Sequence, residues 1–244
     1  LMSDTEPYSV KTDWFEMNDA VLQLRPYQDP IVPVAVASVE SPAGVTLAGK
    51  HGASVLSLSV PRDTIRKTSL AELWSIAEET AAEHGKVMHR KDWGVVMGMH
   101  LADSKEQAFK DIKEGAGNVV TEYFGRTLGN EIPDVPRDQI VDYMVDHNQW
   151  IVGTPDDCIE GIQRLQELTG GFGKFMMRVE DWAPRDKIHR SYELLARYVM
   201  PYFQGSLQGI QTSNEWASER REALQANRYV GIKAATDRFD AGRN

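Results

Sequence analysis

A serine and a proline stand directly after a short apolar run, a pattern that can bind phosphate. Residues 34–37 (VAVA) are small, apolar and rich in β-branched side chains, as in a parallel strand buried on both faces. Ser41 can then cap a helix whose first residue is Pro42, and Gly52 offers a left-handed stop. Unpaired N–H groups at a helix start favour an anion, so this pattern predicts a phosphate near Ser41; an ordinary capped helix without an anion is the alternative.

Other polar residues stand where the next strands are expected to end. Ser57 and Ser59 close an expected strand over 54–59, and His100 lies near the end of another over 92–101. His100 could donate a hydrogen bond to a substrate oxygen, although a lone histidine also serves as a structural donor. The two serine hydroxyls could equally bond to backbone. The remaining histidines show no ligand spacing, so no metal site is predicted.

These candidates sit in an alternation of expected strands and helices, which predicts an α/β fold with a parallel sheet. Helices are expected from Pro42, from Ser69 with Glu72 as a capping box, over 105–128, from Pro155, and from Pro184 to a stop at Met200-Pro201. Four buried strands are expected, at 34–37, 54–59, 92–101 and 175–179. That is half of what a closed (β/α)₈ barrel needs.

Three segments are expected to depart from this alternation. Residues 12–25 predict a hairpin with its turn at Asn18-Asp19, and residues 129–152, with Pro133 and Pro136, predict an insertion. The barrel part is expected over 1–204. The polar tail 205–244 is expected to be helical from 214 to 239.

Composition limits the partners. The formal net charge of −9 leaves no basic excess for nucleic acid or an anionic membrane, and no apolar run of membrane-spanning length appears. The single Cys158 cannot form an internal disulfide, and no signal-peptide pattern is evident, so a cytoplasmic protein is expected.

Several segments carry a resemblance to a known family. They are TDWFEMNDAVLQLRPYQ, PVAVASVESPAGVTLAGKHG, MHLADSKEQA, VGTPDDCIEGIQRL and RSYELLARYVMPYF. Together they make residues 14–203 similar to the C-terminal part of the luciferase-like, flavin-dependent monooxygenases, and closest to the limonene 1,2-monooxygenase-like branch. The resemblance implies a luciferase-like TIM barrel with insertions. The strands here would be its last four, with the first four missing from this chain.

The resemblance also implies a cofactor site. Glu40-Ser41 matches a Glu-Ser pair that lines the flavin phosphate site in the bacterial luciferase α subunit, whereas Gly44 stands where luciferase has a threonine. A carboxylate repels phosphate, so backbone N–H groups and the Ser41 hydroxyl are expected to bind while Glu40 turns outward. The expected cofactor-binding set is Ala37, Ser38, Glu40, Ser41, Ser57 and Ser59, with His100 as the catalytic candidate.

The family's activity would be insertion of one oxygen atom from O₂ into a small apolar substrate resembling a terpene, aldehyde or alkane. Reduced FMN would come from a partner flavin reductase, and a homo-oligomer is expected. Phe175, Met176, Met177 and Trp182 could wall the substrate pocket or belong to the core. Two alternatives stay open: an F420-dependent oxidoreductase of the same barrel family, and a non-catalytic barrel fragment that needs a partner chain.

Overall fold

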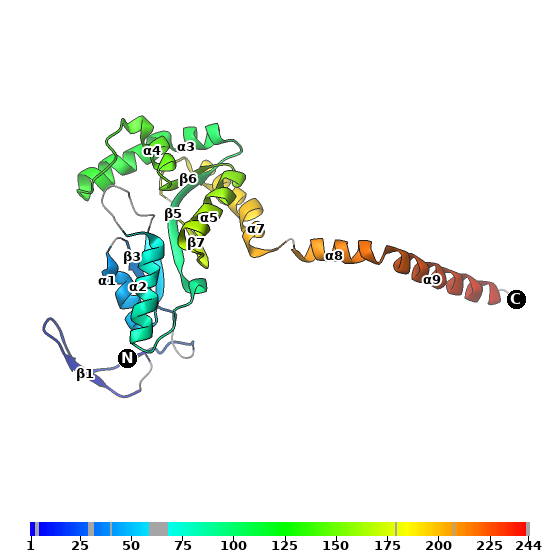
Figure 1. Ribbon diagram of the computed structural model, residues 1–244, viewed down its shortest axis with the longest axis horizontal. Helices are drawn as coiled ribbons and strands as arrows, with labels where there is room; N and C mark the ends of the chain where they lie inside the picture. Colours follow the sequence, from blue (N-terminus) through cyan, green and yellow to red (C-terminus); the bar gives the residue numbers. More distant parts are fainter. Residues whose placement is uncertain are drawn as a thin grey trace.

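The computed structural model describes residues 1–2, 5–28, 32–39, 41–58, 68–178, 180–206 and 208–242. These residues form an α/β body, from which an amino-terminal hairpin and a carboxy-terminal helical arm project (Figure 1). The predicted α/β class with a parallel sheet is therefore confirmed.

The body is built on a parallel sheet of five strands among the described residues. They are β3 (Ala35–Ser38), β4 (Ser54–Leu58), β5 (Gly94–Leu101), β6 (Trp150–Gly153) and β7 (Lys174–Arg178). The order is β3-β4-β5-β6, and β7 also pairs with β5. In register, Ser38 lies opposite Ser57, and His100 lies opposite Val152. The carboxyl ends of the strands therefore share one edge of the sheet.

Helices follow the strands as their capping signals predict. They are α1 (Pro42–His51), α2 (Leu70–Glu83), α3 (Lys105–Asn118), α4 (Ile140–Asp146), α5 (Pro155–Thr169), α6 (Arg185–Leu194) and α7 (Met200–Gln204). A π-helical segment, Val119–Thr127, extends α3, and another, Leu195–Val199, joins α6 to α7. Short 3₁₀ turns occur at Arg90–Asp92 and Arg137–Gln139. Ser69 and Glu72 form the expected capping box, and Gly52 ends α1 in the left-handed conformation, with φ of 64°.

The two faces of the sheet are covered differently. On one face, α1, α2 and α5 pack over alternate strand residues such as Val55, Val95 and Met99. On the other face, α3 and α4 cover only β6 and the carboxyl end of β5, where Trp150 and Trp182 also pack. Toward the amino ends this second face is open, and Ala35, Ala37 and Met176 are exposed there. The prediction that the first strand is buried on both faces is therefore wrong, because no helix of the described chain covers that side.

The hairpin is shifted from its predicted place. Its strands are β1 (Tyr8–Lys11) and β2 (Glu16–Ala20), so the turn lies at residues 12–15. The Thr12 hydroxyl accepts the Phe15 N–H at 3.1 Å and fixes this turn. Asp19 lies inside β2 with φ of 48°, and its N–H donates to the Ser9 hydroxyl at 2.8 Å. Asn18-Asp19 is thus an irregular strand end, not the predicted turn.

Two further predictions differ from the structure. The insertion 129–152 contains α4, but its last residues form β6, which pairs with the end of β5. The expected helix stop at Met200-Pro201 is wrong, because Pro201 occupies the first turn of α7, where a missing N–H is tolerated.

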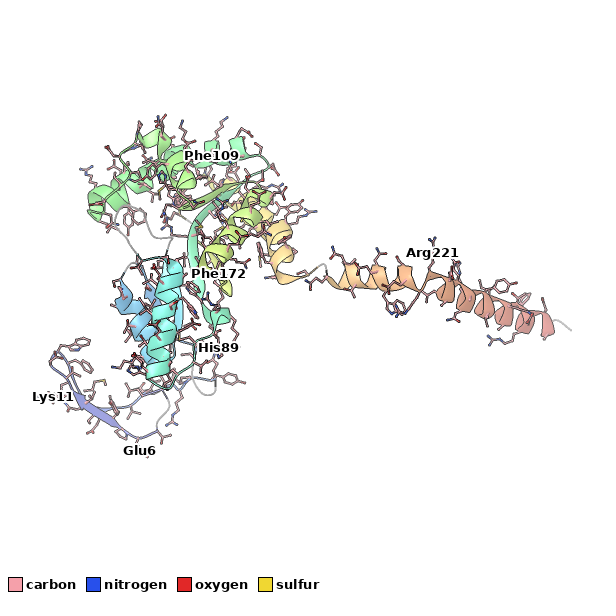
Figure 2. The ribbon with its side chains drawn as sticks, in the orientation of Figure 1. Glu6, Lys11, His89, Phe109, Phe172 and Arg221 are labelled. Carbon is pink, nitrogen blue, oxygen red and sulfur yellow. The ribbon has the colours of Figure 1, made fainter. Side chains whose placement is uncertain are left out.

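The arm consists of α8 (Gln208–Glu219) and α9 (Arg221–Ala241), in the segment where a helical tail is expected. Neither helix has a buried residue, and Figure 2 shows the arm, with Arg221 on it, extending away from the body. The accessible surface is 16436 Å², whereas a compact monomer of 27.4 kDa exposes about 11,000 Å². Among the described residues, no helix is both long and apolar enough to cross a membrane.

Candidate functional site

The start of α1 forms the first part of the site, at the carboxyl end of β3. Ser41 takes the N-cap position in an extended conformation (φ −94°, ψ 153°), but its side chain makes no capping hydrogen bond. The first turn of α1 holds no acidic residue. Because the first N–H groups of a helix have no partner within it, this end of α1 presents free donors and the positive end of the helix dipole.

Close packing of α1 on β3 shapes the floor of the phosphate corner, a name used here for the carboxyl end of β3, Ser41 and the first turn of α1. A Cβ added at Gly44 would lie 3.0 Å from the Ala37 carbonyl oxygen and 3.1 Å from Ser38 Cβ. Gly44 therefore permits the approach, which a threonine at this position would hinder. Ser38 is buried, and its hydroxyl has no hydrogen-bond partner among the residues that the structure describes. Buried hydroxyls nearly always find a partner, so this one is available to a ligand or water.

The other predicted cofactor residues have different surroundings. Ala37 is exposed on the open face, opposite Leu56. Ser57 is buried on the helix-covered face, where its hydroxyl accepts a 2.9 Å hydrogen bond from Trp93 Nε1. Glu40 and Ser59 lie outside the described residues. Ser38 and Ser41 thus lie beside the start of α1 with the Ala37 carbonyl, whereas the Ala37 side chain faces the open side and the Ser57 hydroxyl has a structural partner.

His100 lies two strands away, at the carboxyl end of β5. Its side chain is 4% exposed, and Nε2 lies 3.5 Å from Oδ2 of Asp111 on α3. Burial lowers the pKa of His100 below its usual range, and the nearby Asp111 carboxylate partly opposes this effect. His100 is therefore neutral near pH 7, with a carboxylate placed to stabilise its protonated form.

A small cavity beside His100 is bordered by Glu180 and Trp182, which follow β7. Both Glu180 oxygens have a neighbour: Oε1 forms an ion pair with Arg178 Nε at 2.8 Å, and Oε2 accepts the Trp182 indole N–H at 2.8 Å. Trp182 packs against Trp150, with ring centroids 4.2 Å apart, and is 4% exposed. Trp182 is therefore a core residue. The sequence had left two interpretations open for it, the core or the wall of a substrate pocket.

The remaining substrate-wall candidates divide between core and open face. Phe175 and Met177 pack on the helix-covered side, whereas Met176 is 45% exposed on the open face. Asp111 and Glu180 were not predicted as site residues. The signal for Asp111 was readable, because it lies among the buried helix positions Ala108, Ile112 and Ala116. An acidic residue within a buried stripe requires a partner.

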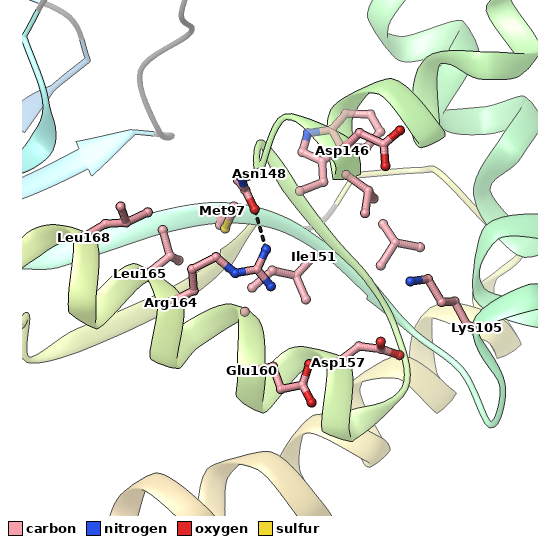
Figure 3. A pocket seen from close by; sticks show the side chains of 14 residues that line it. Met97, Lys105, Asp146, Asn148, Ile151, Asp157, Glu160, Arg164, Leu165 and Leu168 are labelled. Carbon is pink, nitrogen blue, oxygen red and sulfur yellow. Dashed lines mark hydrogen bonds between the residues drawn. The ribbon is translucent and has the colours of Figure 1, made fainter.

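A larger cavity of about 360 Å³ lies elsewhere, between β6, α5 and the start of α3. Arg164 donates to Asn148 Oδ1 at 2.5 Å, and Figure 3 shows Glu160 and Asp157 on the same helix, with Lys105 across the cavity from Arg164. None of the predicted site residues that the structure describes lines this cavity. Within the described ranges, no group of three or more His, Cys, Asp or Glu side chains could hold a metal ion.

Comparison with known proteins places this geometry in a family. A family model described as luciferase-like monooxygenase matches residues 1–170. The chain is 42% identical over 232 residues to 4-hydroxyprotoasukamycin monooxygenase of Streptomyces nodosus subsp. asukaensis, covering 93% of this chain and 62% of that protein. It is 36% identical over 240 residues to limonene 1,2-monooxygenase of Rhodococcus erythropolis, covering 98% and 60%. The chain thus spans about three fifths of these relatives.

Solved structures agree in fold. The oxygenating constituent of 3,6-diketocamphane monooxygenase from Pseudomonas putida, a structure with FMN, superposes with a TM-score of 0.64 at 21% identity, covering 80% of this chain and 58% of that one. The monooxygenase RslO1 of Streptomyces bottropensis gives a TM-score of 0.62 at 19% identity, covering 83% and 57%. Resemblance, family match and fold agree: the chain belongs to the luciferase-like monooxygenase family.

Proposed function

We propose that this chain provides the flavin-phosphate corner of a monooxygenase that inserts one oxygen atom of O₂ into a small apolar substrate. The observation that carries the proposal is the start of α1, where Ser41 leaves the first N–H groups uncapped and no carboxylate of the first turn opposes an anion. Reduced FMN, delivered by a separate reductase, would supply the electrons for oxygen activation.

The chain's own residues have distinct tasks in this proposal. The N–H groups of α1 and the Ser41 hydroxyl bind the phosphate, and the unpartnered Ser38 hydroxyl is available on the floor of the same corner. His100 holds a proton near the reacting centre, because it is buried, neutral and at the end of the strand where barrel enzymes react. The aromatic residues around Trp182 keep water from the carboxyl end of β5.

The relatives support the choice of reaction. Two carry the name monooxygenase, and one of those acts on limonene, which is an apolar terpene. The structural neighbour with FMN is an oxygenating constituent, a name that implies a second component. These points favour oxygenation with FMN and a separate reductase for this chain.

A charge-placement experiment tests the phosphate site. Ser41→Asp keeps a good N-cap, which preserves α1, but sets a negative charge beside the phosphate. We expect FMN binding, measured by flavin fluorescence, to weaken by roughly tenfold or more, about 1.4 kcal/mol. Thr46→Asp adds the same charge at an exposed position within α1 and serves as the matched control. Equal FMN affinity in both variants would overturn the assignment.

An F420-dependent oxidoreductase is the second candidate, favoured by the shared fold. An F420-dependent tetrahydromethanopterin reductase from Methanopyrus kandleri superposes with a TM-score of 0.53, at 16% identity. The phosphate corner suits either cofactor. Oxygen uptake with reduced FMN supports the monooxygenase, whereas hydride transfer to F420 without oxygen uptake supports the alternative.

A barrel fragment that needs a partner chain is the third candidate. The open face and the unburied arm leave a surface well above that of a compact monomer, which supports association with a second copy or another chain. Light scattering of the purified chain with FMN distinguishes an oligomeric enzyme from a non-catalytic fragment. An oligomer that binds FMN supports the enzyme, and a monomer without FMN affinity supports the fragment.

A further inference from the structure

Two ionisable side chains meet inside the body at the carboxyl end of β5. His100 and Asp111 are 4% and 8% exposed, and His100 Nε2 lies 3.5 Å from Asp111 Oδ2. Within the described residues, Nε2 has no hydrogen-bond partner, so its approach to Asp111 is an ion-pair contact at the outer edge of hydrogen-bond distance. Burying a carboxylate is costly without compensation, so the pairing has an energetic reason to persist.

Asp111 is held in place by its own helix. Gln107, one turn earlier on α3, donates its side-chain N–H to Asp111 Oδ1 at 2.5 Å, which leaves Oδ2 for His100. The start of α3 is fixed in turn by the Ser104 cap and by Arg190, which binds Asp103 at 2.5 Å. The carboxylate therefore reaches the strand from a rigid element.

Other charges near His100 are already committed. Glu180 borders the same small cavity from beyond β7, but its two oxygens bind Arg178 and the Trp182 indole. Ser191 of α6 contributes a hydroxyl that accepts the Leu101 N–H. Asp111 is consequently the carboxylate in position to act on the imidazole.

We propose that Asp111 is a positioning residue for His100: it holds the imidazole with the proton on Nε2, so that Nδ1 accepts a proton when neutral and donates one when charged. A proton taken up at Nδ1 would create an imidazolium that Asp111 stabilises, and the same atom would return that proton. The pair itself stands on geometry, whereas its use in oxygenation rests on the proposed function.

The pair is tested first without any catalysis, by NMR titration of His100 in the full chain, with His100→Gln to assign the resonance. Asp111→Asn removes the charge and keeps the shape, so the midpoint of His100 protonation should fall by about one pH unit. Glu114→Gln, an exposed change on the same helix, should leave it unchanged. Equal midpoints in the wild type and Asp111→Asn would overturn the proposal.

A second variant guards against misfolding of the first. Gln107→Leu releases Asp111 but keeps its charge, and should lower the His100 midpoint in the same direction by a smaller amount. An unchanged midpoint there in a folded chain would contradict the held geometry.

The catalytic role has its own readout. In an assay with FMN and a flavin reductase, Asp111→Asn should move the acidic limb of the kcat profile to lower pH, and Asp111→Glu should restore part of the shift. If the chain oxygenates nothing while the NMR shift holds, the proposed function fails and the pair stands. If activity is present but its profile is unmoved, the positioning role is overturned.

Discussion

The Ser57 hydroxyl accepts a 2.9 Å hydrogen bond from the indole N–H of Trp93, and both side chains are almost completely buried. Trp93 also stacks on Trp74 of α2, with ring centroids 4.7 Å apart and an interplanar angle of 17°. Arg90 caps this pair, with its guanidinium 5.5 and 5.6 Å from the two rings. Ser57 therefore joins β4 to the aromatic packing beneath the sheet, on the same face as Ser38 but with its hydroxyl already bound by Trp93.

Replacing Ser57 with alanine should separate stability from flavin binding. The buried Trp93 N–H would lose its acceptor, so the free energy of unfolding should fall by about 1–3 kcal/mol. FMN affinity should stay within about twofold, since less than 0.5 kcal/mol would be lost. Urea denaturation and flavin titration measure the two quantities, with the exposed helix change Ser75→Ala as control. Weaker FMN binding with unchanged stability would return Ser57 to the cofactor site.

Local signals explain why the β3–α1 unit was predictable. Ser41, Pro42 and Gly52 act within a few residues of where they stand, and the structure has the N-cap position, the first helical residue and the left-handed stop at these residues, although the Ser41 side chain makes no capping hydrogen bond. The same holds for the Ser69 capping box. Such signals depend on neighbours in the sequence, so one sequence is enough to read them.

Contacts between residues far apart in the sequence explain the features that the sequence analysis did not predict. β6 has only four residues, Trp150–Gly153, and is a strand because the end of β5 offers it hydrogen bonds. Asn18-Asp19 has turn composition, but the Ser9 hydroxyl binds Asp19 and keeps it in β2. The His100–Asp111 contact joins a strand to the next helix, and no local pattern reveals which side chain a buried histidine will meet.

The buried His100 should make the protein less stable in mild acid. Its pKa is lowered in the folded chain, chiefly by burial, so the unfolded chain binds a proton more readily. This contribution to stability is complete above the unfolded pKa of about 6.5 and is lost as the pH falls from there through the lower folded pKa. Urea midpoints measured between about pH 7.5 and 5 should fall in the wild type, and part of that fall should vanish in His100→Gln. An unaltered slope in the variant would assign the acid sensitivity to other groups.

The single cysteine offers a probe of how readily the native fold opens and exposes its core. Cys158 is buried in α5, its Sγ lies 3.3 Å from Met99 Sδ, and burial raises the pKa of its thiol to about 12. Thiolate is the reactive form, so a disulfide reagent at pH 8 should label the native chain far more slowly than the urea-unfolded chain. Absorbance at completion should correspond to one thiol. Labelling at the unfolded rate under native conditions would contradict the burial of this residue.

Gly98 should not tolerate a side chain. An added Cβ would lie 2.6 Å from Trp182 Cη2 and 2.8 Å from Trp150 Cδ1, within the packed pair of indoles over β5. Gly98→Ala should therefore destabilise by about 1–3 kcal/mol through overpacking and change the near-ultraviolet circular dichroism of the tryptophans. Gly231→Ala, in α9 with open space around it, should be neutral or stabilising, because alanine favours a helix. A Gly98→Ala chain as stable as the wild type would mean that the indoles can separate.

Removal of the arm should leave the body intact. α8 and α9 bury no residue, and they carry exposed apolar side chains such as Ile210, Trp216 and Tyr229. A chain ending at Ser206 should therefore have a free energy of unfolding within about 0.5 kcal/mol of the full chain. Light scattering of both chains then shows whether the arm has a partner in solution. If truncation lowers both the particle mass and the unfolding midpoint, association through the arm contributes to stability, since binding to the folded state raises apparent stability with concentration. If it lowers the midpoint of a monomer, the arm must dock on the body, contrary to its exposed position.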